Sequence, residues 1–173
     1  DAAILYLEGY LWDPEEPRAA MRRAIDVAKA AGRKVAFTLS DAFVIDRYRA
    51  DFNAMIDAGE IDILFANEVE IASLAENEDF DAAVAAVSAK VPLLVVTRGE
   101  HGAICVAGGE RAATSALPMA HVVDTTGAGD HFAAVTGDVG TAVPVLEISK
   151  SEDAAATEIS TAAPGDTLVY RIH

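Results

Sequence analysis

The chain has 173 residues, a length that favours a single domain with a core of ordinary size. Hydrophobic residues make up 52% of it and charged residues 24%, which is the composition of a globular protein and excludes a disordered or collagen-like chain. Its 13 basic and 28 acidic residues give a net charge of −15, and such a surface repels phosphates and anionic lipids. We therefore expect no nucleic-acid and no membrane partner, although backbone N–H groups in a pocket could still bind an anion.

The chain opens inside an apolar run, residues 2–7, without an initiator Met, so we expect that a preceding segment is missing. The single cysteine, Cys105, excludes an internal disulfide and predicts a reducing compartment such as the cytoplasm. Cys105 lies in an apolar, strand-like run with no activating neighbour in sequence, which predicts a buried structural thiol.

Strand and helix signals alternate over the first two thirds of the chain. The short apolar run at residues 3–7 predicts a buried strand. Pro14 and Pro17 then suit a helix start, and apolar residues at helical spacing continue toward Gly32, which is a suitable helix-ending residue. The pattern repeats: we expect strands at 35–39, 61–65 and 93–97, and helices at 68–75, at 80–89 and from a cap at Ser40 or Asp41 to Ala58 and Gly59.

This alternation predicts right-handed βαβ units and an α/β layered domain with a mostly parallel sheet. After Gly102 two short strands separated by Gly108 and Gly109 indicate a hairpin. From residue 135 onward the sequence predicts a β-rich tail, with strands at 143–148 and 167–172. We therefore divide the chain into an α/β domain at 1–134 and a tail at 135–173.

Residues 123–130, with the sequence VDTTGAGD, carry the chemistry. We expect a strand to end here and a helix to begin at the glycines, where free N–H groups and small side chains form an anion site. Asp130 in the first turn is placed to accept a proton from an attacking hydroxyl while the N–H groups stabilise charge on the transferred group. The alternative is a glycine turn followed by an Asp that merely favours the helix start.

Two other polar strings follow predicted strands. Asn67 and Glu70 belong to the string NEVE, and the alternative to a functional pair is a capping box at a helix start. Residues 97–102, TRGEHG, are either a ligand loop or only a tight turn, and Arg98 either contacts phosphate or forms a surface ion pair. Packing is the expected role of Trp12 and Phe132, and the histidines show no metal-binding spacing: His101, His121, His131 and His173.

The DTTGAGD string resembles the second signature of the ribokinase (PfkB) family of carbohydrate and nucleoside kinases. The strings NEVE and TRGEHG are similar to that family's NxxE motif and TxGxxG-like nucleotide loop, in the same order. Each string follows a predicted strand, at the end of the sheet where open parallel sheets bind ligands. Residues 7–13 are also similar to the bacterial adenosine-kinase-like branch, and the resemblance covers residues 1–134.

The resemblance implies a ribokinase-like fold and transfer of the ATP γ-phosphoryl group to a hydroxyl of a sugar or nucleoside, such as ribose or adenosine, with Mg²⁺. It implies that Asp130 is the catalytic base and that Gly127, Ala128 and Gly129 form the anion hole. Glu70 would act on Mg²⁺ through water, as is usual for this strongly hydrated cation. The residues implied to contact the nucleotide or its metal–phosphate group are Asn67, Thr97, Arg98, Gly99, Gly102, Thr125 and Thr126.

The resemblance is incomplete at both sides. Family members carry a preceding portion with a sugar-binding glycine pair and a β-strand lid, and they continue after the signature with an apolar helix that residues 135–138 do not resemble. We therefore expect a partial kinase domain with little or no turnover, because the groups that hold the acceptor are missing. The tail is similar to immunoglobulin-like repeats of bacterial surface proteins, so the alternative is a non-catalytic binding or surface module defined by the tail.

Overall fold

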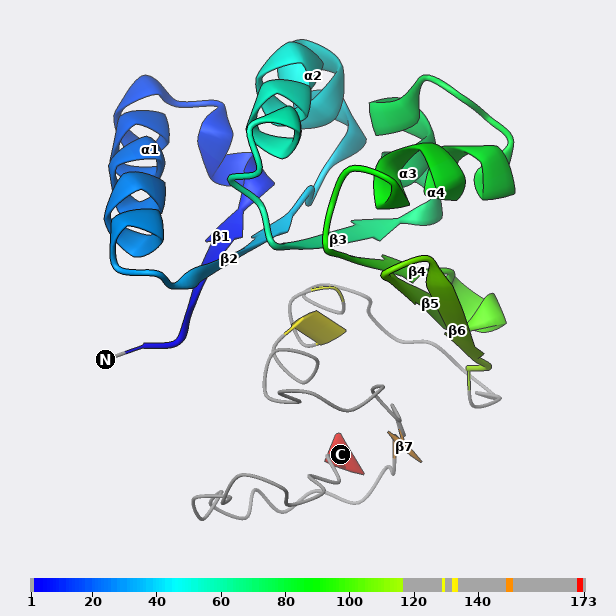
Figure 1. Cartoon of the computed structure of the whole chain (residues 1–173). Helices are drawn as coiled ribbons and strands as arrows, with labels where there is room; N and C mark the ends of the chain where they lie inside the picture. The colour runs from blue at the N-terminus through cyan, green and yellow to red at the C-terminus, as the bar shows by residue number, and fades with distance from the viewer. Residues whose placement is uncertain (1, 117–128, 130–131, 134–148, 151–170, 173) are drawn as a thin grey trace.

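A computed structural model of the chain describes residues 2–116, 129, 132–133, 149–150 and 171–172. Within it, a six-stranded sheet has the order β1-β2-β3-β4-β5-β6 (Figure 1). The first four strands are parallel to one another, and the last two continue the sheet as antiparallel strands. The predicted α/β fold with a mostly parallel sheet is confirmed, with strands at β1 (Ile4–Glu8), β2 (Lys34–Thr38), β3 (Ile63–Asn67), β4 (Leu93–Thr97), β5 (Ala103–Ala107) and β6 (Glu110–Thr114).

Helices α1 to α4 connect the parallel strands and lie on one face of the sheet (Figure 1). The predicted helices are confirmed, with bounds at α1 (Glu15–Ala30), α2 (Ala42–Asp57), α3 (Glu68–Ala75) and α4 (Phe80–Ser88). Two short 3₁₀ helices, η1 (Gly9–Trp12) and η2 (Gly99–His101), follow β1 and β4. Among the described residues, no helix is both long and apolar enough to cross a membrane.

Helix ends follow the predicted signals. Of the two candidate caps for α2, the structure uses Asp41, whose Oδ1 accepts a hydrogen bond of 2.7 Å from the Phe43 N–H. Gly32 and Gly59 follow the ends of α1 and α2 with φ values of +67° and +69°, a conformation in which glycine avoids a steric cost. Local sequence therefore determines where these two helices end.

The predicted boundaries of two strands were wrong by one or two residues. β2 begins and ends one residue before the predicted 35–39, and β3 begins and ends two residues after the predicted 61–65. Ile61 and Leu39 are as deeply buried as the strand residues, so apolar character alone does not distinguish them. Asp62 lies just before β3, and its Oδ2 accepts hydrogen bonds from the Val35 N–H at 2.7 Å and from Lys29 Nζ at 2.9 Å.

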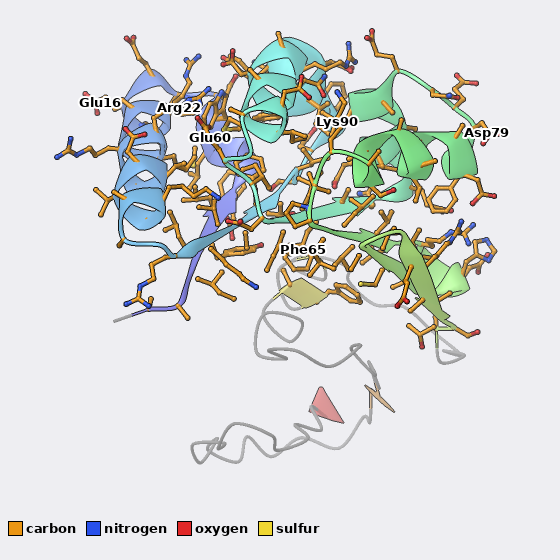
Figure 2. All side chains as sticks on the ribbon, viewed as in Figure 1. Glu16, Arg22, Glu60, Phe65, Asp79 and Lys90 are labelled. Carbon is orange, nitrogen blue, oxygen red and sulfur yellow. The ribbon has the colours of Figure 1, made fainter. Side chains whose placement is uncertain are left out.

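The main core lies between the sheet and the helices. Trp12 is fully buried there, with its ring edge-on to Phe37 and Phe52 at centroid distances of 6.3 and 5.7 Å. The predicted packing role of Trp12 is thus confirmed. On the same side of the sheet, Arg22 of α1 forms an ion pair of 3.1 Å with Glu60 beyond the end of α2 (Figure 2).

A smaller apolar cluster covers the opposite face of the sheet, where Figure 2 shows Phe65. It contains Ala133, with Phe132 and the half-buried Cys105 packed against it. The predicted packing role of Phe132 and the structural character of Cys105 agree with this location. Burial also raises the pKa of the Cys105 thiol, which disfavours the reactive thiolate.

Little of the predicted tail lies within the described residues. β7 (Ser149–Lys150) and β8 (Arg171–Ile172) pair in parallel, and β8 falls at the end of the strand predicted at 167–172. The strand predicted at 143–148 lies outside the described residues, so the β-rich character of the tail as a unit stays a prediction.

Candidate functional site

The carboxyl ends of β3 and β4 bring two of the three motifs together. Asn67 is the last residue of β3, Thr97 is the last residue of β4, and the two are Cα partners in the parallel ladder. Thr97 Oγ1 donates a hydrogen bond of 3.5 Å to the carbonyl oxygen of Ala66. Because neighbouring parallel strands end at the same edge, the groups that follow Asn67 and Thr97 share one edge of the sheet.

Asn67 and Glu70 form a capping box at the start of α3. The Asn67 side-chain oxygen accepts from the Glu70 N–H at 2.8 Å, and the Asn67 N–H donates to Glu70 Oε2 at 3.0 Å. A third bond of 2.7 Å runs from Asn67 Nδ2 to Glu70 Oε1. The structure therefore contains the capping box that was the alternative to a functional pair. Since a carboxylate offers about four lone-pair sites, these bonds leave both oxygens able to accept from water as well.

The Glu70 carboxyl is buried, with only 7% of the residue exposed. Burial raises its pKa; the hydrogen bond from the Asn67 backbone opposes this rise, and the negative charge of Asp41 adds to it. A cation beside Glu70 would offset both the desolvation and the repulsion. The Glu70 carboxylate thus fits a hydrated Mg²⁺ held by one carboxylate through water. Among the described residues, no group of three or more His, Cys, Asp or Glu side chains could hold a metal ion.

Residues 97–102 form a tight loop around η2. The Arg98 N–H donates to the Gly102 carbonyl at 2.7 Å, and the Gly102 N–H donates to the Gly99 carbonyl at 3.1 Å. A Cβ at Gly102 would lie 1.9 Å from the Thr114 carbonyl oxygen, so only glycine fits against the end of β6. The tight-turn alternative is therefore realised, and a ligand role for the loop stays a prediction.

Arg98 connects this loop to the preceding motif. Its Nε donates to Glu68 Oε1 at 2.8 Å, and its guanidinium carbon lies 4.3 Å from the centre of the Phe80 ring. Of the two roles considered for Arg98, the structure shows the ion pair. The side chain of the neighbouring His101 is largely exposed.

Most of the third motif lies outside the described residues. This applies to Thr125, Thr126, Gly127, Ala128 and Asp130, and to the other three histidines, so their predicted roles stay predictions. Gly129 is helical and exposed, with open space where a Cβ would lie, and residues 132–133 are helical too. These residues agree with a helix that begins at the glycines of the motif.

Sequence reasoning missed the turn that joins β2 to α2. Ser40 has a φ of +66°, and the Asp41 N–H donates to the Leu39 carbonyl at 2.8 Å, which together define a strained γ-turn. Such strain is often found at functional sites, and Asp41 in this turn lies close enough to Glu70 for its negative charge to raise the pKa of that carboxyl. Because Ser40 is not a glycine, no local signal announced the positive φ.

These features define an α/β protein of the class that binds ligands at the carboxyl ends of parallel strands. The pfkB family carbohydrate kinase profile matches residues 1–136, and the chain belongs to this family. The ribokinase-like resemblance of the sequence is thereby confirmed. A comparison with curated proteins gives no match.

Solved structures share the fold. An adenosine kinase from Sinorhizobium meliloti is 45% identical, with a TM-score of 0.74 over 76% of this chain and 40% of its own. A probable sugar kinase from Rhizobium etli CFN 42 is 42% identical, with a TM-score of 0.75 over 78% of this chain and 41% of its own. Ribokinase II from E. coli is 23% identical, with a TM-score of 0.68 over 77% of this chain and 44% of its own, which shows a common fold. The chain thus spans less than half the length of these structures.

Proposed function

We propose that the protein is an ATP-dependent phosphotransferase that acts on a hydroxyl of a sugar or nucleoside. The observation that carries the proposal is the placement of the Asn67–Glu70 pair beside the 97–102 loop, at adjacent strand ends of a pfkB-family chain. The 45% identity to an adenosine kinase supports a nucleoside or ribose-like acceptor.

In this proposal Asp130 is the catalytic base. Its carboxylate takes the proton of the acceptor hydroxyl while that oxygen bonds to the γ-phosphorus of ATP and ADP leaves with the electrons of the broken P–O bond. The N–H groups of residues 127–129 stabilise charge on the transferred phosphoryl oxygens. Thr125 and Thr126 precede this anion hole and contact the nucleotide phosphates.

The other two motifs orient the nucleotide and its metal. Asn67 and Glu70 hold the metal–phosphate group, with Glu70 acting through water, and Mg²⁺ supplies charge neutralisation when bound. Thr97, Arg98, Gly99 and Gly102 build the nucleotide loop. The E. coli ribokinase II structure was solved in complex with ATP and Mg²⁺, which supports this choice of cofactors for the shared fold.

We also propose that residues 1–134 are the kinase portion and residues 135–173 a separate tail, a division supported by the family match over 1–136. Because the chain spans about 40% of the adenosine kinase, we expect it to bind nucleotide with little or no turnover on its own.

Calorimetric titration of Mg·ATP tests the nucleotide site. We expect binding in the millimolar range or tighter by the wild type and equally by Asp130→Asn, since the base contributes to the chemical step rather than to nucleotide affinity. Absence of heat at millimolar Mg·ATP would refute the nucleotide site in this chain.

ADP formation with adenosine and with ribose tests the base in turn: any turnover should fall at least about 100-fold in Asp130→Asn. The matched control is Asp26→Asn on the exposed face of α1. Measurable turnover at the same rate in wild type and Asp130→Asn would refute the assignment of the base.

A further inference from the structure

Arg98 connects two segments that the proposed function assigns to different tasks. It belongs to the 97–102 loop, and its partner Glu68 belongs to the first turn of α3, between Asn67 and Glu70. The two residues are 30 positions apart in the chain, and their side chains are 29% and 38% exposed. A half-buried charge pair of this kind is screened less by water and salt than a fully exposed one.

A second contact fixes the same guanidinium. Phe80, the first residue of α4, packs against the main core and presents its ring to Arg98 at 4.3 Å. Arg111 of β6 approaches the same ring at 6.0 Å and pairs with Asp81 at 2.7 Å. Arg98 is therefore held by contacts with both α3 and α4.

These contacts make a direct phosphate role for Arg98 unfavourable. A phosphate that bound the guanidinium would lie beside the Glu68 carboxylate and be repelled by it. Release of Arg98 from Glu68 would also break a charge-assisted hydrogen bond and the cation–π contact with Phe80. The loss of these two contacts would weaken the binding of the nucleotide.

We propose that Arg98 is a positioning residue that ties the 97–102 loop to the first turn of α3 through Glu68, and that it does not contact the phosphates. The inference rests on the proposed function, which assigns the nucleotide to the 97–102 loop and the metal–phosphate group to the Asn67–Glu70 pair. The hydrogen bonds of the Arg98 and Gly102 N–H groups close within the loop itself, whereas the Arg98–Glu68 pair joins the loop to α3. The tie sets the distance between the nucleotide loop and the Asn67–Glu70 pair, and small errors in such distances are costly for phosphoryl transfer.

Trypsin tests the tie without any ligand, because the Arg98–Gly99 bond is itself a tryptic site. In Glu68→Gln the loop loses its partner, and we expect cleavage after Arg98 to accelerate about two- to fivefold, the range for a partly exposed ion pair. Cleavage after Arg23, inside α1, reports global unfolding in the same sample. Glu78→Gln, which removes an equal charge from the exposed α3–α4 connection, should leave both rates unchanged. Unchanged cleavage after Arg98 in Glu68→Gln would overturn the proposal.

Mg·ATP affinity separates a positioning role from a phosphate contact. If Arg98 acts through Glu68, then Glu68→Gln and Arg98→Gln weaken binding by similar factors, and the double variant weakens it no further. If Arg98 contacts phosphate, Arg98→Gln weakens binding while Glu68→Gln leaves it unchanged or tightens it, and the proposal is wrong. Failure of the wild type to bind Mg·ATP would refute the proposed function, while the trypsin result still decides whether the tie exists.

Discussion

Gly9 lies where the chain leaves β1 and passes the end of β2. A Cβ at this position would lie 2.5 Å from the Leu39 carbonyl oxygen and 2.9 Å from the Thr38 carbonyl oxygen, both of which are backbone atoms. Backbone cannot move aside as a flexible side chain can, so the strand end and η1 approach each other only because residue 9 is glycine.

Gly9→Ala should therefore lower the free energy of unfolding by about 2 kcal/mol or more, the cost of an overpacked contact. The matched control is Gly59→Ala, where φ is +69° but a Cβ meets open space. That change should cost only about 1 kcal/mol from backbone strain. Urea unfolding of both variants decides, and a loss in Gly9→Ala no larger than in Gly59→Ala would contradict the steric argument.

Glu70 makes stability depend on pH. In the unfolded chain its carboxyl titrates at the ordinary value of 4.5, whereas burial raises the pKa in the folded protein. Between these two values the folded state binds more protons than the unfolded state, so the free energy of unfolding falls as pH rises. The contribution is fully present below pH 4.5 and is lost as pH passes the folded pKa.

Glu70→Gln should lack this component, because an amide does not titrate. The difference between the unfolding free energies of wild type and Glu70→Gln, measured in urea without metal from pH 4 upward, should shift in favour of the variant as pH increases. Parallel curves for the two proteins would show that Glu70 is not perturbed. Glu78→Gln at an exposed position should follow the wild type.

At the scale of elements, the helices differ in what their caps do. Asp79 caps α4 with a single hydrogen bond of 2.8 Å from the Ala82 N–H. Asn67 caps α3 in the same way but also donates two hydrogen bonds to the buried Glu70 carboxylate. One side chain thus stabilises a helix start and a buried acidic group together.

Asn67→Ala should cost about 2–3 kcal/mol of unfolding free energy, because it removes a cap and leaves Glu70 without one of its donors. Asp79→Ala, with loss of the cap alone, should cost about 1 kcal/mol. Chemical denaturation of the two variants at neutral pH compares them directly. Equal losses would mean that the Nδ2 bond to Glu70 contributes nothing to stability.

The elements themselves were largely predictable. Helix α2 illustrates why: Asp41 before it and Gly59 after it are local signals that act within one turn. β2 and β3 illustrate the limit, since Leu39 and Ile61 are buried outside the strands and only hydrogen bonding to neighbouring strands defines the ends. The γ-turn at Ser40 was beyond prediction because contacts with β3, such as the Leu39 N–H bond to Phe65 at 3.0 Å, hold it.

At the scale of the whole molecule, the sheet has two unlike faces. Helices α1 to α4 cover one face and enclose the main core, while the other face carries a smaller cluster that includes Phe65 and Ala133. Asn67 and Thr97, from the first two motifs, lie at one edge of this sheet, so a single βαβ arrangement both builds the core and brings these two motifs together.

Some properties of this protein follow from the sequence by itself. The alternation of strands and helices, the hairpin at Gly108 and Gly109, the capping spacing of Asn67 and Glu70 and the pfkB motifs all depend on residues close together in the chain. Only the tertiary structure decided that Arg98 pairs with Glu68, that Glu70 is buried near Asp41 and that Gly9 must be glycine. The physical reason is that these properties arise from distances between segments far apart in sequence, and no local pattern encodes those distances.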